Sequence, residues 1–229
     1  MGVTSRFLSY NLEPSVKGSD DVVRFLYIGR LSHIRKLERL LIASRMLKQT
    51  TDKFSLTFIG VDETDGYYNT LAEQWDLSEN VSILPPVPYE KIGDVIAQHD
   101  VMLAYVPESP TDWMYHPTLK VIEYSAMGAP IIATNFAPNR AIVTHEKNGL
   151  LVENTPDAFA AAMNRFVDEP NLLETCYREG RKSRYAVTWK HVADRYVQTV
   201  YQPLLDAGTD EGLPKRTDFT GSFESDSTL

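Results

Sequence analysis

Short apolar runs alternate with longer amphipathic stretches along most of the chain. The apolar runs with the composition of buried strands lie at residues 22–28, 54–59, 81–84, 101–106, 131–133 and 150–152. Apolar residues recur at helical spacing between and after them, at residues 37–47, 67–75, 89–98, 119–126, 156–167, 171–185 and 189–205. Such alternation is typical of a parallel sheet covered by helices on both faces. The sequence therefore predicts an α/β fold: a doubly wound, Rossmann-like parallel sheet of six strands.

Three parts of the chain can be separated by composition. A length of 229 residues suffices for one substantial domain or two small ones, and the alternation occupies residues 21–205. Residues 1–20 form a lead-in segment without a core of their own. Residues 206–229 are rich in Asp, Ser, Thr and Gly, so we expect a disordered acidic tail.

Composition excludes several classes of protein. A net charge of −8 has the wrong sign for a nucleic-acid binder, which needs a basic surface to neutralise phosphates. The single cysteine, Cys176, excludes an internal disulfide and a cysteine-rich metal site. No apolar run approaches the ~20 residues of a membrane span, and the N-terminus lacks a signal-peptide apolar region. We therefore expect a cytoplasmic protein without a metal or a cofactor.

The stretch from His116 to Thr134 has the features of a phosphate-binding helix start that leads into a buried strand. Gly128 and Pro130 end the helix. Lys120 and Glu123 are three residues apart and project from one side of its first turns. A helix N-terminus with an added lysine suits a diphosphate, and a carboxylate one turn further can accept hydrogen bonds from sugar hydroxyls. The alternative for this pair is an exposed salt bridge of little energetic value.

The carboxyl ends of the strands carry the other candidate ligands. In a doubly wound sheet, a ligand binds at these ends, where the strand order reverses. The segments there are Gly29-Arg30, Gly60-Val61-Asp62, Leu84-Pro85, Pro107-Glu108 and the loop before Lys120. Arg30 and Lys120 supply positive charge, which suits an anionic ligand, although Arg30 could instead pair with a surface carboxylate. Asp62 and Asp65 could hold a metal or, without further ligands, form a turn that caps the next helix.

Several of these segments resemble the donor domain of glycosyltransferase family 4, also called group 1. The matching stretches are Phe25-Leu-Tyr-Ile-Gly-Arg-Leu-Ser32, Pro117-Thr-Leu-Lys-Val-Ile-Glu-Tyr-Ser-Ala-Met-Gly-Ala-Pro130, Asn148-Gly-Leu-Leu-Val152 and the closing Trp189…Tyr201 helix. Their order and spacing agree from about Val22 to Leu205. The family has the GT-B architecture of two Rossmann-like domains, so the resemblance implies one half of a GT-B fold. It implies an acceptor domain missing from this chain, which is then a fragment or one subunit of a split enzyme.

The resemblance also implies roles for individual residues. Arg30, after the strand-ending Gly29, would neutralise the diphosphate with a second basic group, Arg35 or Lys36. Glu123 would hold the ribose hydroxyls. The backbone amides of Thr118 and Leu119 would cap the phosphates together with Lys120; Leu84 and Pro85 would contact the base. Tyr115 and His116, beside the phosphate loop, complete the expected donor-binding residues, and Arg30, Lys36 and Glu123 are the expected catalytic residues.

By resemblance, the activity would be transfer of a hexose from a nucleotide diphosphate sugar to an unknown acceptor, with retention of configuration and without a metal. Any peripheral membrane contact would be made through the missing half. Tyr115 is a departure, because the family often has a glutamate eight residues before Glu123. Two alternatives remain: a non-catalytic nucleotide-binding module of GT-B fold, and a nucleotide-sugar epimerase. Trp113 could stack on a sugar or a partner domain, or anchor its loop, and Asp112 or Glu108 could contact the sugar.

Overall fold

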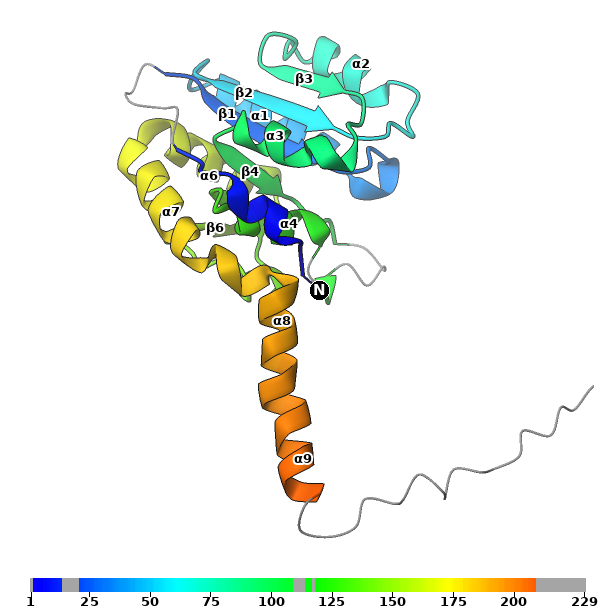
Figure 1. Ribbon diagram of the computed structural model, residues 1–229. Helices are drawn as coiled ribbons and strands as arrows, with labels where there is room; N and C mark the ends of the chain where they lie inside the picture. The colour runs from blue at the N-terminus through cyan, green and yellow to red at the C-terminus, as the bar shows by residue number, and fades with distance from the viewer. Residues whose placement is uncertain (1, 14–20, 109–113, 117, 209–229) are drawn as a thin grey trace, which may run out of the picture. The chain divides into compact units, whose positions relative to one another are not determined.

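The computed structural model describes residues 2–13, 21–108, 114–116 and 118–208. Its strands form one sheet in the order β3-β2-β1-β4-β5-β6 (Figure 1). The strands are β1 (Val23–Ile28), β2 (Phe54–Ile59), β3 (Val81–Leu84), β4 (Val101–Ala104), β5 (Ile131–Thr134) and β6 (Gly149–Val152). Every neighbouring pair is parallel, which confirms the predicted doubly wound sheet. The order reverses between β1 and β4, so the ligand crevice expected of such a sheet lies at their carboxyl ends.

Helices cover both faces of this sheet. The evidence is that every residue of β4 and of β5 is buried, although successive side chains of a strand point to opposite faces. Helix α1 packs against α2 and α6, whereas α4 packs against α7. The bounds of the helices in this part of the chain are α1 Glu38–Lys48, α2 Tyr67–Gln74, α3 Ile92–Ala97, α4 Leu119–Met127, α5 Ala137–Arg140, α6 Pro156–Asp168 and α7 Pro170–Ser183.

Two predicted elements are shorter than expected. Strand β4 stops at Ala104 instead of residue 106, because the Val106 N–H donates to the Thr134 hydroxyl at 2.9 Å rather than to a neighbouring strand. The helix predicted at residues 89–98 begins as a 3-10 turn, η3 (Tyr89–Lys91), and is α-helical only from Ile92. Pro88 precedes that turn, and its carbonyl accepts the Lys91 N–H at 2.8 Å.

Residues 2–13 pack onto the sheet domain. This segment contains a 3-10 turn, η1 (Ser5–Ser9), which lies against α4. Val3, Phe7 and Leu12 are buried in the same apolar cluster as the sheet residues. The Arg181 guanidinium donates to the Leu12 carbonyl at 2.6 Å, which ties the segment to α7. The expected lead-in therefore contributes to the core of the domain that follows it.

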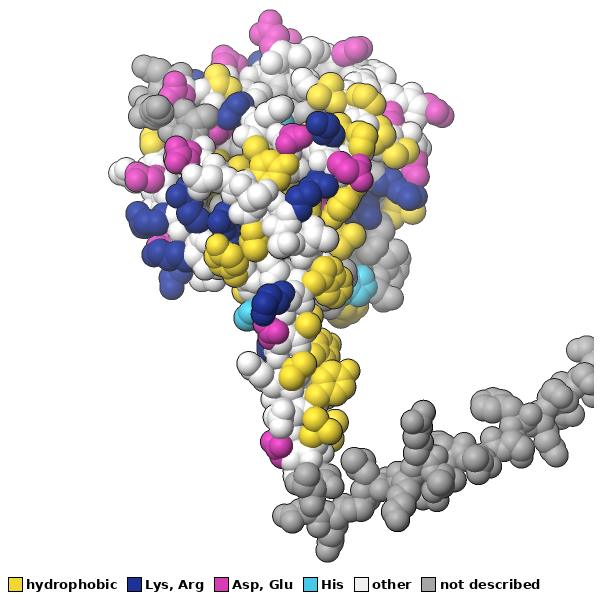
Figure 2. Space-filling view, viewed as in Figure 1, with side chains coloured by type: hydrophobic (Ala, Val, Ile, Leu, Met, Phe, Trp, Pro, Cys, Tyr) yellow, Lys and Arg dark blue, Asp and Glu magenta, His cyan; other side chains and the backbone are white. Residues whose placement is uncertain are grey.

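The chain divides into two compact units, Met1–Trp189 and Lys190–Leu229, whereas the sequence analysis placed the end of the domain at residue 205. The second unit is helical as far as it is described. It comprises most of α8 (Trp189–Tyr196), a π-helical turn (Val197–Tyr201) and α9 (Gln202–Gly208). Hydrophobic side chains lie along one side of this helix (Figure 2), and the exposed ones include Tyr196, Val197, Val200, Tyr201, Leu204 and Leu205. The expected tail from residue 209 onward lies outside the described residues.

Candidate functional site

Two glycines let the loops after β1 and β2 run in contact. Gly29 has a φ of +154°, and its N–H donates to the Ile59 carbonyl at 2.9 Å. A Cβ atom on Gly60 would lie 1.8 Å from the Gly29 carbonyl oxygen. The contact continues through the Leu31 N–H, which donates to the Val61 carbonyl at 2.8 Å. The backbone at the carboxyl end of β1 is therefore fixed by its neighbour strand.

Lys120 reaches this backbone from the first turn of α4. Its ammonium nitrogen lies 3.7 Å from the ring centroid of Tyr27, a β1 residue. The same nitrogen is 3.1 Å from the position that a Cβ atom on Gly29 would occupy. Lys120 is only 9% exposed, so it does not form the exposed salt bridge that the sequence left open. It lies at the switch point of the sheet, next to the end of β1.

Three buried polar atoms near this point have no hydrogen-bond partner among the described residues: Tyr27 Oη, Thr118 Oγ1 and Lys120 Nζ. Thr118 is the N-cap residue of α4, but its side chain does not cap the helix. Burying a polar group without a partner is unfavourable. A bound anion or sugar would satisfy these atoms together with the free N–H groups of the helix start.

Two charged side chains of opposite sign act on Lys120. Burial lowers the pKa of the Lys120 amine well below its usual range; the nearby Arg35 lowers it further, and Glu123 opposes both. Arg35 also acts electrostatically on the Tyr27 hydroxyl. Lys36, the other candidate for the second basic group, has a left-handed backbone with φ 49° and caps the turn His33–Arg35. Of this pair, Arg35 is the residue whose charge acts on the Lys120 amine.

Glu123 lies one turn after Lys120 and is 7% exposed. Burial raises the pKa of its carboxyl, while the nearby Tyr89 hydroxyl and the charge of Lys120 hold that pKa down. Tyr89 comes from η3, after β3. Tyr89 was not among the predicted site residues, because it appeared as an ordinary residue of the helix predicted at residues 89–98.

Arg30 does not join this cluster in the described structure. Its side chain is 64% exposed and forms an ion pair with Glu63 at 2.9 Å. This is the surface pairing that the sequence analysis gave as the alternative to phosphate binding. Such exposed pairs contribute little energy, so the guanidinium can exchange one anionic partner for another at small cost.

The remaining candidates lie on the surface at the carboxyl edge of the sheet. Pro85 and His116 are exposed, and Tyr115 is 76% exposed. Large exposed apolar side chains gather in the loops and helix starts of this edge, and we call them the apolar rim: Ile34, Val61, Tyr67, Leu84, Tyr89, Tyr115 and Leu119. Asp112, Trp113 and Pro117 lie outside the described residues.

The other features do not form a second site. Asp62 accepts hydrogen bonds from the backbone N–H groups of Thr64 and Gly66 at 2.8 and 2.9 Å, which confirms the polar turn before α2. Within residues 2–13, 21–108, 114–116 and 118–208, no group of three His, Cys, Asp or Glu side chains could hold a metal ion. In the same ranges no helix is both long and apolar enough to cross a membrane.

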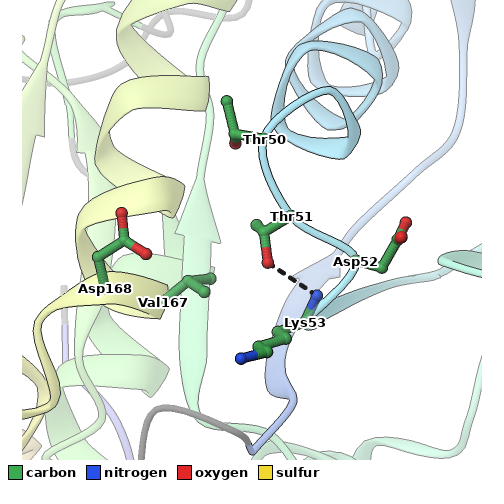
Figure 3. Close-up of a pocket in the computed structure, with 6 residues that line it drawn as sticks. All are labelled: Thr50, Thr51, Asp52, Lys53, Val167 and Asp168. Carbon is green, nitrogen blue, oxygen red and sulfur yellow. Dashed lines mark hydrogen bonds between the residues drawn. The ribbon is translucent and has the colours of Figure 1, made fainter.

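A hollow at the opposite edge of the sheet lies between the α1–β2 connection and the end of α6 (Figure 3). Its lining residues are Thr50, Thr51, Asp52, Lys53, Val167 and Asp168. The Thr51 hydroxyl accepts the Lys53 backbone N–H at 3.1 Å (Figure 3). Because this edge holds the amino ends of the strands, it is not where a ligand of a doubly wound sheet binds.

Solved structures share this fold. The sucrose-phosphate synthase of Thermosynechococcus elongatus superposes with a TM-score of 0.67 at 21% identity over 90% of this chain and 52% of that one. The structure of Anabaena HepE in complex with UDP-glucose superposes with a TM-score of 0.68 at 16% identity, and the match covers 88% of this chain and 56% of HepE. The C-terminal domain of LpcC, a group 1 glycosyltransferase family protein from Francisella tularensis, gives 0.64 at 13% identity and is covered to 97% of its length. The fold is thus that of one half of a GT-B glycosyltransferase.

Sequence comparison agrees. The chain is 28% identical to YtcC of Bacillus subtilis (strain 168) over 90% of its length, and covers 50% of that protein. The chain is 25% identical to the D-inositol 3-phosphate glycosyltransferase of Rhodococcus jostii (strain RHA1). This match covers 83% of the chain and 43% of that enzyme. The chain thus spans about half the length of the curated relatives it matches. The profile of the glycosyl transferases group 1 family matches residues 12–183. On this evidence, the chain belongs to the group 1 glycosyltransferases.

Proposed function

We propose that the chain is the donor-binding half of a glycosyltransferase that uses a nucleotide diphosphate sugar. The observation that carries this proposal is Lys120, a buried amine at a helix start that no described side chain satisfies. An unpaired lysine beside free backbone N–H groups is suited to a diphosphate. HepE, which has the same fold, binds UDP-glucose.

In this proposal each site residue has one task. Lys120 and Arg35 bind the diphosphate with the backbone amides of Thr118 and Leu119. Arg30 exchanges Glu63 for a phosphate oxygen when the donor arrives. Lys36, expected from the sequence as a catalytic residue, instead shapes the turn that presents Arg35, because its own backbone is left-handed.

The nucleoside is held on the other side of Lys120. Glu123 accepts hydrogen bonds from the ribose hydroxyls, since a carboxylate has two acceptor oxygens. Leu84 and Pro85, at the end of β3, contact the base through their backbone. His116 and Tyr115 lie beside the diphosphate at the mouth of the site.

The proposed reaction is transfer of a hexose with retention of configuration. As the bond from the sugar to the diphosphate breaks, negative charge grows on the phosphate oxygens. Cations already fixed beside those oxygens stabilise the transition state without reorganisation. Arginine suits this role because its planar guanidinium can bridge two oxygens. We therefore propose a transfer in which basic side chains, rather than a divalent metal, neutralise the leaving group.

The acceptor is proposed to bind to a second domain or subunit in the cytoplasm. Two observations support such a partner: the chain spans half the length of its relatives, and the apolar rim around the site is exposed. Apolar patches at the edge of a site mark surfaces that another protein or domain covers. Any contact with a membrane surface is proposed to occur through that partner.

A second candidate function is a nucleotide-binding module that does not transfer sugar. Tyr115 favours it, because it stands where the family often has a glutamate. The experiment is calorimetry of the full chain with UDP, GDP and ADP and with their glucose derivatives, followed by a search for released sugar. We expect one nucleoside diphosphate and its sugar to bind, with tighter binding of the sugar derivative and no turnover by this chain alone. Equal affinity with and without the sugar would support the module, and product from donor alone would support an epimerase.

A further inference from the structure

Two further buried polar atoms, Tyr105 Oη and Asn154 Nδ2, have no hydrogen-bond partner among the described residues. Tyr105 directly follows β4, and Asn154 lies two residues after the end of β6. Both side chains therefore belong to the carboxyl edge of the sheet, where the donor is proposed to bind. Tyr105 is 1% exposed and Asn154 is 9% exposed. Burying polar groups in this way is unfavourable unless a ligand or a water molecule satisfies them.

Tyr105 lies beside the proposed diphosphate site. Leu26 of β1 is opposite Met102 of β4. The next residue of β1, Tyr27, is thus opposite Leu103 and points to the same face of the sheet. Tyr105 is two residues beyond Leu103, so its side chain is on this face as well, and its hydroxyl acts electrostatically on that of Tyr27. This is the face on which the proposed diphosphate-binding amine meets the Tyr27 ring.

Tyr105 and Asn154 flank the first turn of α6. The Tyr105 ring meets the ring of Phe159 edge-on, with 5.5 Å between the centroids. Phe159 lies one turn after Thr155, whose carbonyl accepts the Phe159 N–H at 3.2 Å. Asn154 directly precedes Thr155, the N-cap residue of α6. The two unpartnered groups are therefore held by the same helix start.

Arg39, in the first turn of α1, completes a polar cluster with Tyr105 and Asn154. Its guanidinium donates to the backbone carbonyl of Asn154 at 2.9 Å and to the side-chain oxygen of Asn154 at 3.5 Å. Since that oxygen faces Arg39, the amide nitrogen of Asn154 is left for another partner. Arg39 is half-buried, so it is the member of the cluster closest to solvent.

The strand order gives the direction in which a bound donor extends. The proposed function puts the base at the end of β3 and the diphosphate at the ends of β1 and β4, two and three strands further along. Neighbouring strands are about 4.8 Å apart, so these positions are separated by about 10–14 Å. The sugar is attached to the far end of the diphosphate and therefore extends over β4, β5 and β6. The polar cluster lies at this part of the edge.

We propose that Tyr105, Asn154 and Arg39 form the subsite for the sugar that is transferred. The Asn154 amide nitrogen and the Arg39 guanidinium donate hydrogen bonds to sugar hydroxyls, whereas the Tyr105 hydroxyl can donate or accept. The sugar reaches the two buried atoms past the half-buried Arg39 side chain. The inference rests on the proposed function, because it takes the orientation of the nucleotide from it.

The test is calorimetry of the full chain with UDP, GDP and ADP and with their glucose derivatives. Tyr105→Phe removes the hydroxyl and keeps the ring. Asn154→Asp replaces the amide nitrogen with an oxygen and keeps the oxygen that faces Arg39. We expect the wild type to bind one glucose derivative more tightly than the corresponding diphosphate. In each variant this preference is expected to fall by about fivefold, the scale of one hydrogen bond.

Tyr177→Phe is the matched control. Tyr177 is also buried, but its hydroxyl donates to the Asp100 carbonyl at 3.1 Å, at the amino end of β4. We expect Tyr177→Phe to unfold at a lower urea concentration and to keep the wild-type preference for the sugar. Tyr105→Phe loses a hydroxyl that no described residue pairs, so its unfolding midpoint in the absence of ligand is expected to be unchanged or higher.

A wild-type sugar preference in both Tyr105→Phe and Asn154→Asp overturns the subsite, and so does a wild type that binds the diphosphate and its glucose derivative equally. In both cases the diphosphate site of the proposed function stands. A lower unfolding midpoint in Tyr105→Phe also overturns the subsite, because the hydroxyl would then be satisfied by the protein or by a bound water. No binding of any of the six compounds by the wild type contradicts the proposed function and the subsite together.

Discussion

At the scale of single residues, the site depends on a lysine that the fold buries without satisfying it. Burial and the nearby Arg35 lower the pKa of the Lys120 amine, although the face of the Tyr27 ring favours an ammonium group. Replacing a buried charge with an apolar side chain of similar length is often neutral or stabilising. We therefore expect Lys120 to reduce the stability of the free protein.

The stability contribution of Lys120 depends on pH. Because the pKa of its amine is lower in the folded than in the unfolded protein, the unfolded chain binds more protons between the two values. Stability therefore rises with pH in this window, which ends near the ordinary lysine pKa of about 10.4. Urea unfolding of the wild type and Lys120→Met from pH 6 to 9.5 measures this effect. We expect the free energy of unfolding of Lys120→Met to exceed that of the wild type by about 1–2 kcal/mol at pH 6, and this difference to shrink as pH rises. A difference that grows with pH would refute the expectation.

The sequence predicted Lys120 and Glu123 because they follow a helix start at fixed spacing. It could not choose between Arg35 and Lys36, since two adjacent basic residues fit one motif position. The choice depends on backbone conformation: Lys36 is left-handed, and Arg35 is the residue that acts on Lys120. Tyr27 escaped prediction because it appears in the sequence as an ordinary strand residue.

At the scale of elements, the ends of β1 and β2 shape the floor of the site. Their contact requires a residue without a side chain at Gly60, because a Cβ atom there would overlap the Gly29 carbonyl. The sequence indicated these glycines as strand ends. The close approach of the two loops follows only from the parallel pairing of β1 with β2.

We expect Gly60→Ala to destabilise the protein by about 3 kcal/mol or more, because backbone must move to relieve the overlap. Gly66→Ala is the matched control. Gly66 has a φ of +80° but open space around its Cβ position, so only the left-handed strain of about 1–2 kcal/mol applies. Urea denaturation of both variants gives the two values. Equal destabilisation would mean that the β1–β2 loops are not in contact.

The N-terminal segment is the element that sequence patterns described least well. Its apolar residues are too few and too irregularly spaced to predict a helix or a strand. Their burial arises from the surface that α4, α7 and η3 present together. The strands and most helices, in contrast, were predictable because each carries a periodic apolar pattern that its own burial requires.

At the scale of the whole molecule, the sheet domain and the final helix belong to two separate compact units. The unit Met1–Trp189 contains the sheet, the site and the N-terminal segment. Trp189 belongs with it, since its N–H donates to the Val3 carbonyl at 3.0 Å. The sequence placed this boundary later because the helical pattern continues unbroken to residue 205, and periodicity alone does not reveal where burial stops.

A chain truncated after Trp189 is expected to melt within about 3 °C of the full chain, because a loss of 1 kcal/mol shifts Tm by a few degrees in a domain of this size. Differential scanning calorimetry of both chains measures this. A large drop in Tm would show that residues 190–229 contribute to the stability of the sheet domain.

In the proposed function, the crevice between the ends of β1 and β4 binds a nucleoside diphosphate through Lys120. Calorimetric titration of the wild type, Lys120→Met and the exposed control Lys182→Met with UDP, at one pH and salt concentration, tests it most directly. We expect Lys120→Met to lose at least about tenfold in affinity, the scale of a charge-assisted hydrogen bond, and Lys182→Met to bind as the wild type does. Equal affinity in Lys120→Met and the wild type, or no binding of UDP, GDP or ADP by the wild type, would contradict the claim.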